Sequence, residues 1–226
     1  MATKKANEAT VDIRPIEEVT FQVRVVGDTP LIEHNWSEKA KRQLLEKMQG
    51  TSKGKAKDPK NPPEEFIHSM YWLTEKPEVN CFTPEDECMR LYEEAIAKGA
   101  RFGFPVTGFK QAAISAAFRL GWSKDKMSLR GVFFIESDAN GLVEIKADTP
   151  LFREDVVRVN NGGTDLRYRG EFRNWYADLT IRYNKNGNYD IDSIVNIINA
   201  GGHVCGVGEW RPERDGQYGM FHVELT

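Results

Sequence analysis

The stretch GGHVCGVGEWRPERDGQYGMFHVELT (201–226) places six glycines, two arginines and a tryptophan directly before a strand-like ending. Glycine at this density indicates a backbone that turns sharply or lies close against another surface. Arginine and tryptophan among the glycines favour a surface that is anionic and flat. The stretch is therefore a candidate binding loop, and its place in the fold depends on the elements around it.

A helix precedes this stretch and a strand ends it. Asp190 is a good N-cap for the helix IDSIVNIINA (191–200). Its apolar residues share one face, namely Ile191, Ile194, Val195 and Ile198. Gly201 and Gly202 are expected to stop the helix. GMFHVELT (219–226) is expected to be the closing strand.

Three strands are predicted before that helix. EFRNWYADLTIRY (171–183) alternates apolar and polar residues as one long strand that ends at Asn186. RGVFFIESD (130–138) and GLVEIKA (141–147) predict two shorter strands, joined as a hairpin by a turn at 139–141.

The clearest helix is FPVTGFKQAAISAAFRLG (104–121), which Thr107 can cap and Gly121 ends. Its regularly spaced apolar residues are Phe109, Ala112, Ala113, Ala116, Ala117 and Leu120. Because most of these are small, we expect the helix to lie close against a sheet. The first strand, VTFQVRVVGDTPLIEH (19–34), is expected to bend at Gly27-Asp28.

Between this strand and this helix, residues 35–104 are too many for a loop and predict a separate lobe. A helix is plausible at 35–50, and GTSKGKAKDPKNPP (50–63) has the composition of a flexible loop. EEFIHSMYWL (64–73) fits a short strand or a helix equally well. TPEDECMRLYEEAIAKG (83–99) predicts a helix with a threonine N-cap.

The order of these elements predicts an α+β fold. Without the insertion and the extra hairpin it is β-α-β-β-α-β, a ferredoxin-like arrangement with helices on one face of an antiparallel sheet. We expect a flexible tail at 1–18, a ferredoxin-like domain at 19–34 and 105–226, and an inserted, mostly helical lobe at 35–104.

Composition narrows the function classes. The 226-residue chain has a net charge of −3 and a pI of about 5.9, which disfavours a protein that is basic over its whole surface. Charge is segregated, however, with eight Lys/Arg against three acids at 38–60 and seven acids against two bases at 75–94. This asymmetry is compatible with a local anion-binding face and with contacts between copies of the chain.

Cysteines and apolar runs point to a cytoplasmic protein without cofactor or metal. Cys81, Cys88 and Cys205 are too few for a disulfide framework, and with His203 they match no usual zinc spacing. No run approaches the length of a membrane span, and the polar start does not look like a signal peptide.

The glycine-rich stretch, in this order of elements, resembles the RAMP superfamily, the RNA-binding subunits of CRISPR effector complexes. GGHVCGVGEWRPERDGQYGMF (201–221) looks like the G-loop of that family, and FPVTGFKQAAISAAFR (104–119) like the start of its first helix. VGDTPLIEH (26–34) is similar to its first strand and the loop that follows. The resemblance covers 19–34 and 101–226.

The backbone subunits of that family fit best, because they carry an insertion between first strand and first helix. The resemblance implies a non-catalytic subunit that grips the phosphates of single-stranded or guide RNA within a filament of copies or related subunits. The chain departs from the family where Gln111 follows Lys110 and where the next arginine is Arg119. A relative carried by a virus or mobile element is an alternative.

The candidate RNA contacts fall in three groups. Those of the G-loop are Gly206, Gly208, Trp210, Arg211, Arg214, Gly216, Tyr218 and Gly219. Those of the first helix are Lys110 and Arg119. Those of a basic and aromatic stretch are Arg158, Arg167, Arg169 and Arg173, interleaved with Tyr168, Phe172 and Trp175. The lysines at 53, 55, 57 and 60 could contribute from the inserted lobe.

Structural explanations compete with these RNA contacts. The glycines could form a β-hairpin with its turn at Asp215-Gly216. Arg211 and Arg214 could brace the loop, either by stacking on Trp210 or by pairing with a nearby glutamate, Glu209 or Glu213.

Enzyme alternatives rest on few residues. Asp138, Glu144 and Lys146 resemble a metal-dependent nuclease motif. His34 could be the general base of a metal-independent RNA cleavage. Some related subunits cut bound RNA with an aspartate in a loop, and Asp28 fits the place of that residue loosely. A further alternative is a protein-interaction or single-strand-binding module that kept the fold.

Overall fold

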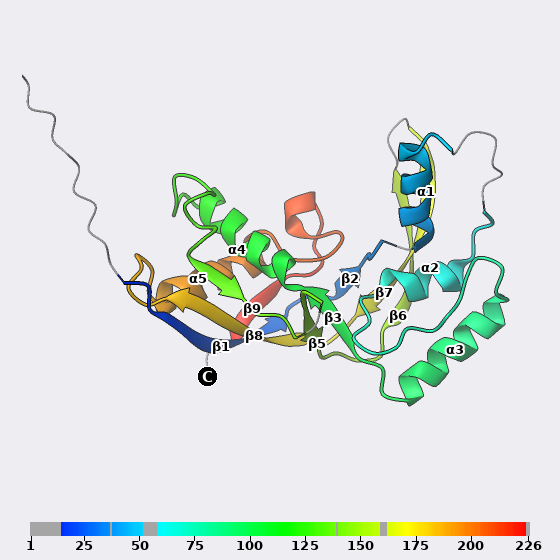
Figure 1. Ribbon diagram of the computed structural model, residues 1–226, viewed down its shortest axis with the longest axis horizontal. Coiled ribbons are helices and arrows are strands. Elements are labelled where there is room, and N and C mark those ends of the chain that lie inside the picture. The colour runs from blue at the N-terminus through cyan, green and yellow to red at the C-terminus, as the bar shows by residue number, and fades with distance from the viewer. Residues whose placement is uncertain (1–14, 37, 52–57, 139, 159–161, 225–226) are drawn as a thin grey trace, which may run out of the picture.

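The computed structural model describes residues 15–36, 38–51, 58–138, 140–158 and 162–224. Most of the predicted tail and the lysines at 53, 55 and 57 lie outside these ranges. The described chain is a mixed α+β structure with five helices and antiparallel sheets (Figure 1).

The main sheet has the strand order β4-β8-β1-β9, with antiparallel neighbours throughout. Its strands are β1 (Glu18–Gly27), β4 (Phe133–Ile135), β8 (Tyr176–Asn184) and β9 (Phe221–Glu224). Two helices, α4 (Val106–Arg119) and α5 (Ile191–Val204), cover one face of it (Figure 1). The alternation of β8 buries Leu179 and Ile181 under these helices, where they meet Phe109 of α4 and Ile194 of α5 in one core.

A second sheet, of order β2-β7-β6, lies beside the inserted helices (Figure 1). Its strands are β2 (Leu31–Glu33), β6 (Leu151–Arg158) and β7 (Thr164–Phe172). The helices are α1 (Glu38–Met48), α2 (Pro62–Ser69) and α3 (Glu85–Ala97), and a small sheet pairs β3 (Phe102–Pro105) with β5 (Leu142–Ile145). The inserted segment therefore shares its part of the molecule with β6 and β7, which come much later in the chain.

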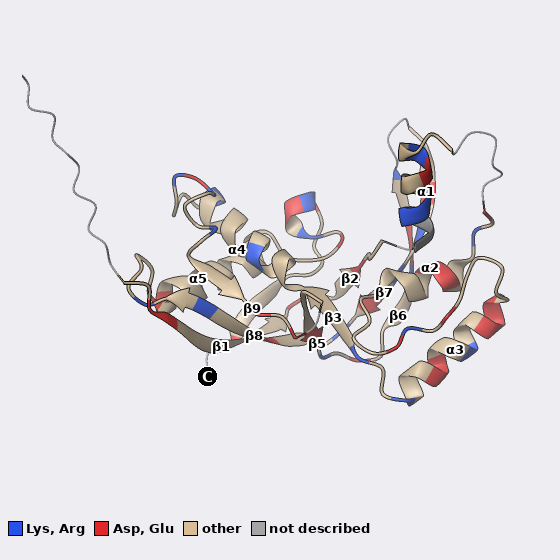
Figure 2. Ribbon diagram, viewed as in Figure 1, with Lys and Arg blue, Asp and Glu red and all other residues tan. Residues whose placement is uncertain are grey.

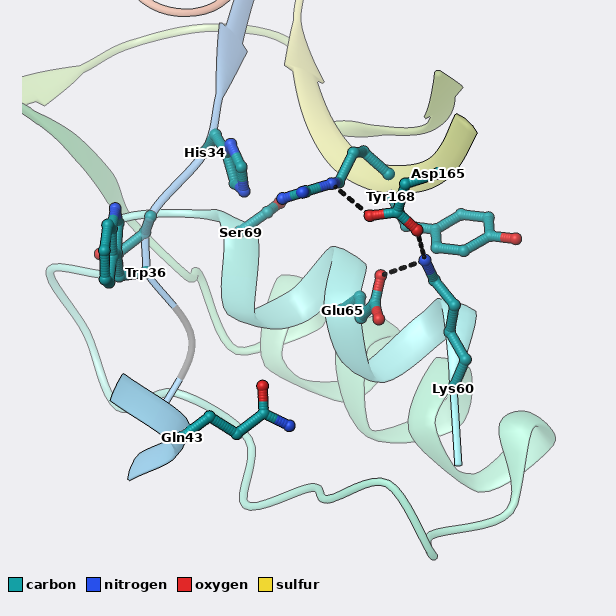
Figure 3. A pocket seen from close by; sticks show the side chains of 10 residues that line it. His34, Trp36, Gln43, Lys60, Glu65, Ser69, Asp165 and Tyr168 are labelled. Atoms are coloured by element: carbon teal, nitrogen blue, oxygen red, sulfur yellow. Dashed lines mark hydrogen bonds and ion pairs between the residues drawn. The ribbon is translucent and has the colours of Figure 1, made fainter. Parts of the chain in front are cut away.

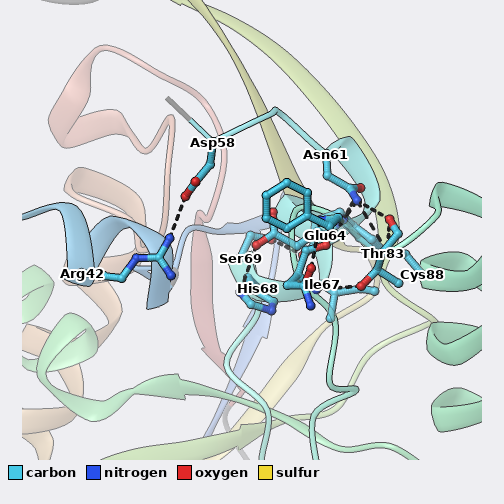
Figure 4. Close-up of polar contacts among 12 residues, drawn as sticks. Arg42, Asp58, Asn61, Glu64, Ile67, His68, Ser69, Thr83 and Cys88 are labelled. Atoms are coloured by element: carbon cyan, nitrogen blue, oxygen red, sulfur yellow. Dashed lines mark hydrogen bonds and ion pairs between the residues drawn. The ribbon is translucent and has the colours of Figure 1, made fainter. Parts of the chain in front are cut away.

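Side-chain hydrogen bonds hold the inserted helices together (Figure 4). Asn61 caps α2 by accepting from the amide of Glu64 at 3.2 Å, and its Nδ2 donates to the carbonyl of Thr83 at 2.7 Å, just before α3. Arg42 on α1 pairs with Asp58 at 2.6 Å. Each helix is thus tied to the segment that precedes the next.

Several sequence predictions are wrong at the ends of helices. Gly201 and Gly202 do not stop α5, which continues through both to Val204. Neither Thr83 nor Thr107 is a cap, because α3 and α4 begin after prolines and have no side-chain cap. The Asp190 cap is confirmed, since its carboxylate accepts from the amide of Ser193 at 2.9 Å.

Two strand predictions are also wrong. The segments at 130–138 and 141–147 do not form a hairpin, because β4 pairs with β8 whereas β5 pairs with β3. The strand expected at 171–183 is broken, and its parts β7 and β8 belong to different sheets. No described helix is long and apolar enough to cross a membrane.

Candidate nucleic-acid interface

The glycine-rich loop between α5 and β9 packs tightly against β2 and the residues before it. The amide of Glu209 donates to the carbonyl of Ile32 at 2.9 Å, and that of Gly219 donates to Pro30 at 2.8 Å. A Cβ on Gly208 would lie 2.5 Å from the same Ile32 oxygen. The loop is therefore fixed to the start of the second sheet.

The glycines provide backbone conformation and close packing rather than a row of open amides. Gly206, Gly208 and Gly219 have positive φ angles of 65°, 77° and 64°, a region that L side chains rarely adopt. The amides of Gly206, Gly216 and Gly219 donate to the carbonyls of Gly201, Arg211 and Pro30. A phosphate cradle that used the amides of these three glycines would have to break those hydrogen bonds.

The predicted hairpin at Asp215-Gly216 is also absent. The loop instead contains a 3-10 turn, η1 (Pro212–Arg214), followed by Asp215 with φ of 60°.

Arg211 braces this loop, as one of the structural explanations expected. Its Nη1 donates to the carbonyl of Gly208 at 2.9 Å, and its Nη2 lies 3.1 Å from Glu213. Arg119 on α4 approaches the same carboxylate at 3.5 Å. Burial disfavours the charged form of Glu213, but Arg211 and Arg119 outweigh that cost and lower its pKa. Tyr218 is likewise occupied, because the guanidinium carbon of Arg153 lies 4.6 Å from its ring centroid.

A groove of about 760 Å³, here called the basic groove, runs between this loop and α4. Six cations line it, namely Lys110, Arg119, Lys126, Arg130, Arg211 and Arg214. Glu213 is the single acid among the described lining residues. The acids of α3 lie at the opposite end of the molecule from α4 (Figure 2). The groove is thus a local positive site on a chain of net negative charge.

The six cations differ in their availability. Arg130 and Arg214 are exposed and have no ion-pair partner within the described part of the chain. Lys110 is half-buried, its pKa is lowered by burial, and its Nζ lies 4.1 Å from the ring centroid of Phe134. Lys126 approaches the hydroxyl of Ser115 at 3.1 Å. Arg130 and Arg214 can therefore meet an anion without losing a protein partner.

The predicted basic and aromatic stretch is neutralised by acids of the same sheet. Arg169 is only 4% exposed and pairs with Asp155 at 3.0 Å and with Glu209 at 3.4 Å, so the predicted RNA contact would require it to leave these acids. Arg167 pairs with Asp165 at 2.8 Å, and Arg173 with Glu171 at 2.7 Å.

The aromatic residues of that stretch are buried too, since Phe172 and Trp175 are core residues and Tyr168 is almost fully covered. Arg158 is exposed at the end of β6. Of the four arginines in this stretch, it is the one without an ion-pair partner in the described ranges.

The residues of the nuclease alternatives are engaged in other contacts. Asp138 accepts from the backbone amide of Glu144 at 2.9 Å, and Lys146 pairs with Asp178 at 3.3 Å. Asp28 bonds to His222 at 2.6 Å. Among the described residues, no group of three or more His, Cys, Asp or Glu side chains is placed to hold a metal.

His34 lies at the junction between the loop and the second sheet. Its Nδ1 is 3.6 Å from Glu209 and 3.4 Å from Arg169. This contact connects β2, β7 and the glycine-rich loop through side chains.

Comparison of the sequence with models of known protein families and with curated proteins gave no match.

Proposed function

We propose that this chain is a non-catalytic RNA-binding subunit of the RAMP type, with a ferredoxin-like domain whose basic groove holds the phosphates of a single strand. The sequence of elements β1, α4, β4, β8, α5 and β9, with both helices on one face of an antiparallel sheet, supports this domain type. The observation that carries the proposal is the ratio of six cations to one acid in the groove. In this proposal the chain works in an assembly with copies of itself or related subunits.

The opposite face of the main sheet is a poorer candidate for RNA. Its arginines are already neutralised: Arg24 pairs with Asp178 at 2.7 Å, and Arg182 pairs with both Glu18 and Glu136. A phosphate there would have to compete with these carboxylates, whereas Arg130 and Arg214 have no such competitor among the described residues. The basic groove is therefore the better candidate for the RNA-binding surface.

Binding in the groove should depend on salt and little on sequence. Each phosphate of a single strand that a cation neutralises releases about 0.7 of a counterion, so affinity falls steeply with salt concentration. Contacts to phosphates position the strand but do not distinguish bases. This behaviour matches the backbone capture that the resemblance implies.

The test is the combined variant Arg130→Ala and Arg214→Ala. We expect weaker binding of two unrelated single-stranded RNAs, and a plot of log affinity against log salt that is shallower by about 1.4 units. Fluorescence anisotropy at several salt concentrations measures both. The melting temperature should barely change, because neither side chain has a described partner.

The matched control removes the same charge elsewhere, with Arg24→Ala and Arg90→Ala. If this pair weakens binding as much as the groove pair does, the effect is one of net charge and the groove has no special role. Strong preference for one RNA that survives high salt would also contradict the proposal.

A further inference from the structure

A second cavity, of about 420 Å³, lies where the end of β2 meets α1, α2 and β7 (Figure 3). We call it the Trp36 pocket. In Figure 3, His34, Trp36, Gln43 and Lys60 surround an open space. The other residues that matter to its chemistry are Asn35, Glu65, Asp165 and Arg167.

The Trp36 pocket is electrically balanced, unlike the basic groove. Asp165 bridges Lys60 and Arg167, with both distances at 2.8 Å, and Lys60 also lies 3.8 Å from Glu65. Lys60 and Arg167 lower the pKa of Asp165, so the bridge is ionised at neutral pH. Two cations thus face two carboxylates, so the described lining residues carry no excess charge that would attract a phosphate.

Its remaining groups suit a flat, neutral molecule with a polar edge. The side chain of Trp36 is 57% exposed, although an indole ring is usually well covered in folded proteins. The amides of Asn35 and Gln43 each offer both donors and an acceptor. An unpaired nucleobase has these two features, a face that stacks on aromatic rings and an edge that forms hydrogen bonds.

A third cavity, of about 220 Å³, lies between the Trp36 pocket and the basic groove. That cavity shares Thr107, Gln111, Arg211 and Glu213 with the groove, and it shares His34 with the Trp36 pocket. The three cavities therefore follow one another past the glycine-rich loop, with His34 at the boundary of the Trp36 pocket. A strand held in the groove and continuing along this path reaches Trp36.

We propose that the Trp36 pocket takes up one unstacked base of the RNA strand whose phosphates lie in the basic groove. The inference rests on the proposed function and adds a subsite that grips a base without a net charge. Stacking on Trp36 supplies the affinity, and the amides of Asn35 and Gln43 orient the edge of the base.

The test is Trp36→Ala, with binding of labelled oligouridylate and of an abasic strand of equal length measured by fluorescence anisotropy. Loss of one stacked base should weaken oligouridylate binding by about tenfold. The salt dependence should stay unchanged, because stacking releases no counterions. The abasic strand should bind the variant and the wild-type chain equally, and Trp36→Phe should restore most of the loss.

Trp122→Ala is the matched control, because Trp122 is similarly exposed, at 53%, and lines none of the three cavities. Equal losses in both tryptophan variants, or a Trp36→Ala loss that includes the abasic strand, would overturn the base pocket. Unchanged RNA binding by Trp36→Ala would also overturn the base pocket. In that case the proposed function would still stand if the Arg130 and Arg214 variant lost RNA affinity. A wild-type chain that binds no RNA would overturn both.

Discussion

Glu33 has a fully buried carboxyl group at the end of β2. One of its oxygens accepts a hydrogen bond from the backbone amide of Tyr71 at 2.8 Å, and the other has no hydrogen-bond partner in the described chain. Burial raises its pKa well above the ordinary value of 4.5, and the Tyr71 hydrogen bond offsets only part of that shift. Burial and the charges of Glu33 and Glu209 in turn raise the pKa of Tyr71 to about 12.

The raised pKa of Glu33 predicts a specific pH dependence of stability. Between pH 4.5 and the higher native pKa, the folded chain keeps a proton that the unfolded chain has lost. The free energy of unfolding therefore falls as pH rises, by at most about 1.4 kcal/mol per pH unit. Glu33→Gln cannot titrate there, so the stability of the wild-type chain relative to the variant should fall between pH 5 and pH 8. Urea denaturation at both pH values measures this difference, and parallel pH profiles would refute it.

Single residues of the candidate site were only partly predictable. Lys110, Arg119, Arg211 and Arg214 were named from the sequence and line the groove, but Lys126 and Arg130 were missed. Both missed residues lie in the irregular segment after α4, where no periodicity indicates which way a side chain points. Conversely, Arg169 has the same appearance in the sequence as an available arginine. Its neutralisation depends on Asp155, which pairs with it only through the register of β6 and β7.

At the scale of elements, α4 and α5 cross at a point without room for side chains. A Cβ on Gly201 would lie 2.7 Å from the backbone nitrogen of Ala113 and 2.8 Å from its Cα. Gly202 is equally restricted, because a Cβ there would lie 1.9 Å from the carbonyl oxygen of Phe221 in β9. Ala112 and Ala113 of α4 therefore allow close contact with α5, a neighbour that the sequence did not predict for them.

This crossing predicts that Gly201→Ala destabilises the protein. Alanine in a helix interior ordinarily stabilises by about 1 kcal/mol over glycine. Here the atoms it meets belong to the backbone of α4 and cannot move aside, and overpacking typically costs about 1–3 kcal/mol. We expect a net loss of about 1 kcal/mol or more in urea denaturation. Gly131→Ala is the control, because a Cβ there meets nothing within 4 Å; equal effects of the two substitutions would contradict the crossing.

Periodicity located most elements but could not assign them to sheets. The segment at 171–183 joins the end of β7, where every residue is buried, to β8, which has one buried face, and the two strands belong to different sheets. The break itself depends on Asn174, with φ of 50°, and on Trp175, whose indole nitrogen donates to the carbonyl of Thr29 at 2.8 Å. Such a long-range contact leaves no local signal in the sequence.

At the scale of the whole molecule, a chain of buried and half-buried charges joins the second sheet to the glycine-rich loop. Arg169 is at its centre, between Asp155 of β6 and Glu209 of the loop, with His34 beside it. The contact with His34 is the main cause of a lowered pKa of Glu209. The charge of Arg169 adds to this effect, and both outweigh the cost of burial. The loop that borders the basic groove is therefore held from the side of the molecule that contains the Trp36 pocket.

Because Arg169 joins the second sheet to the loop, we expect Arg169→Met to destabilise the protein. The substitution removes a buried charge but keeps an unbranched side chain. Arg153, at 2.9 Å, then remains as the ion-pair partner of Asp155 in the described ranges. Breaking a buried pair typically costs about 3–5 kcal/mol, and because Arg153 remains we expect about 2–3 kcal/mol here. Arg173→Met is the control, since its side chain is 58% exposed and should change stability by less than about 0.5 kcal/mol.

Two measurements distinguish this role from an RNA contact. Urea denaturation gives the loss of stability, and hydrogen exchange should show faster exchange at the amide of Glu209, whose bond to Ile32 anchors the loop. RNA affinity should fall only as far as the loop loosens, with an unchanged salt dependence, because Arg169 meets no phosphate. If Arg169→Met instead kept full stability and reduced the salt dependence by about one unit, the arginine would contact RNA after all, as the sequence alone suggested.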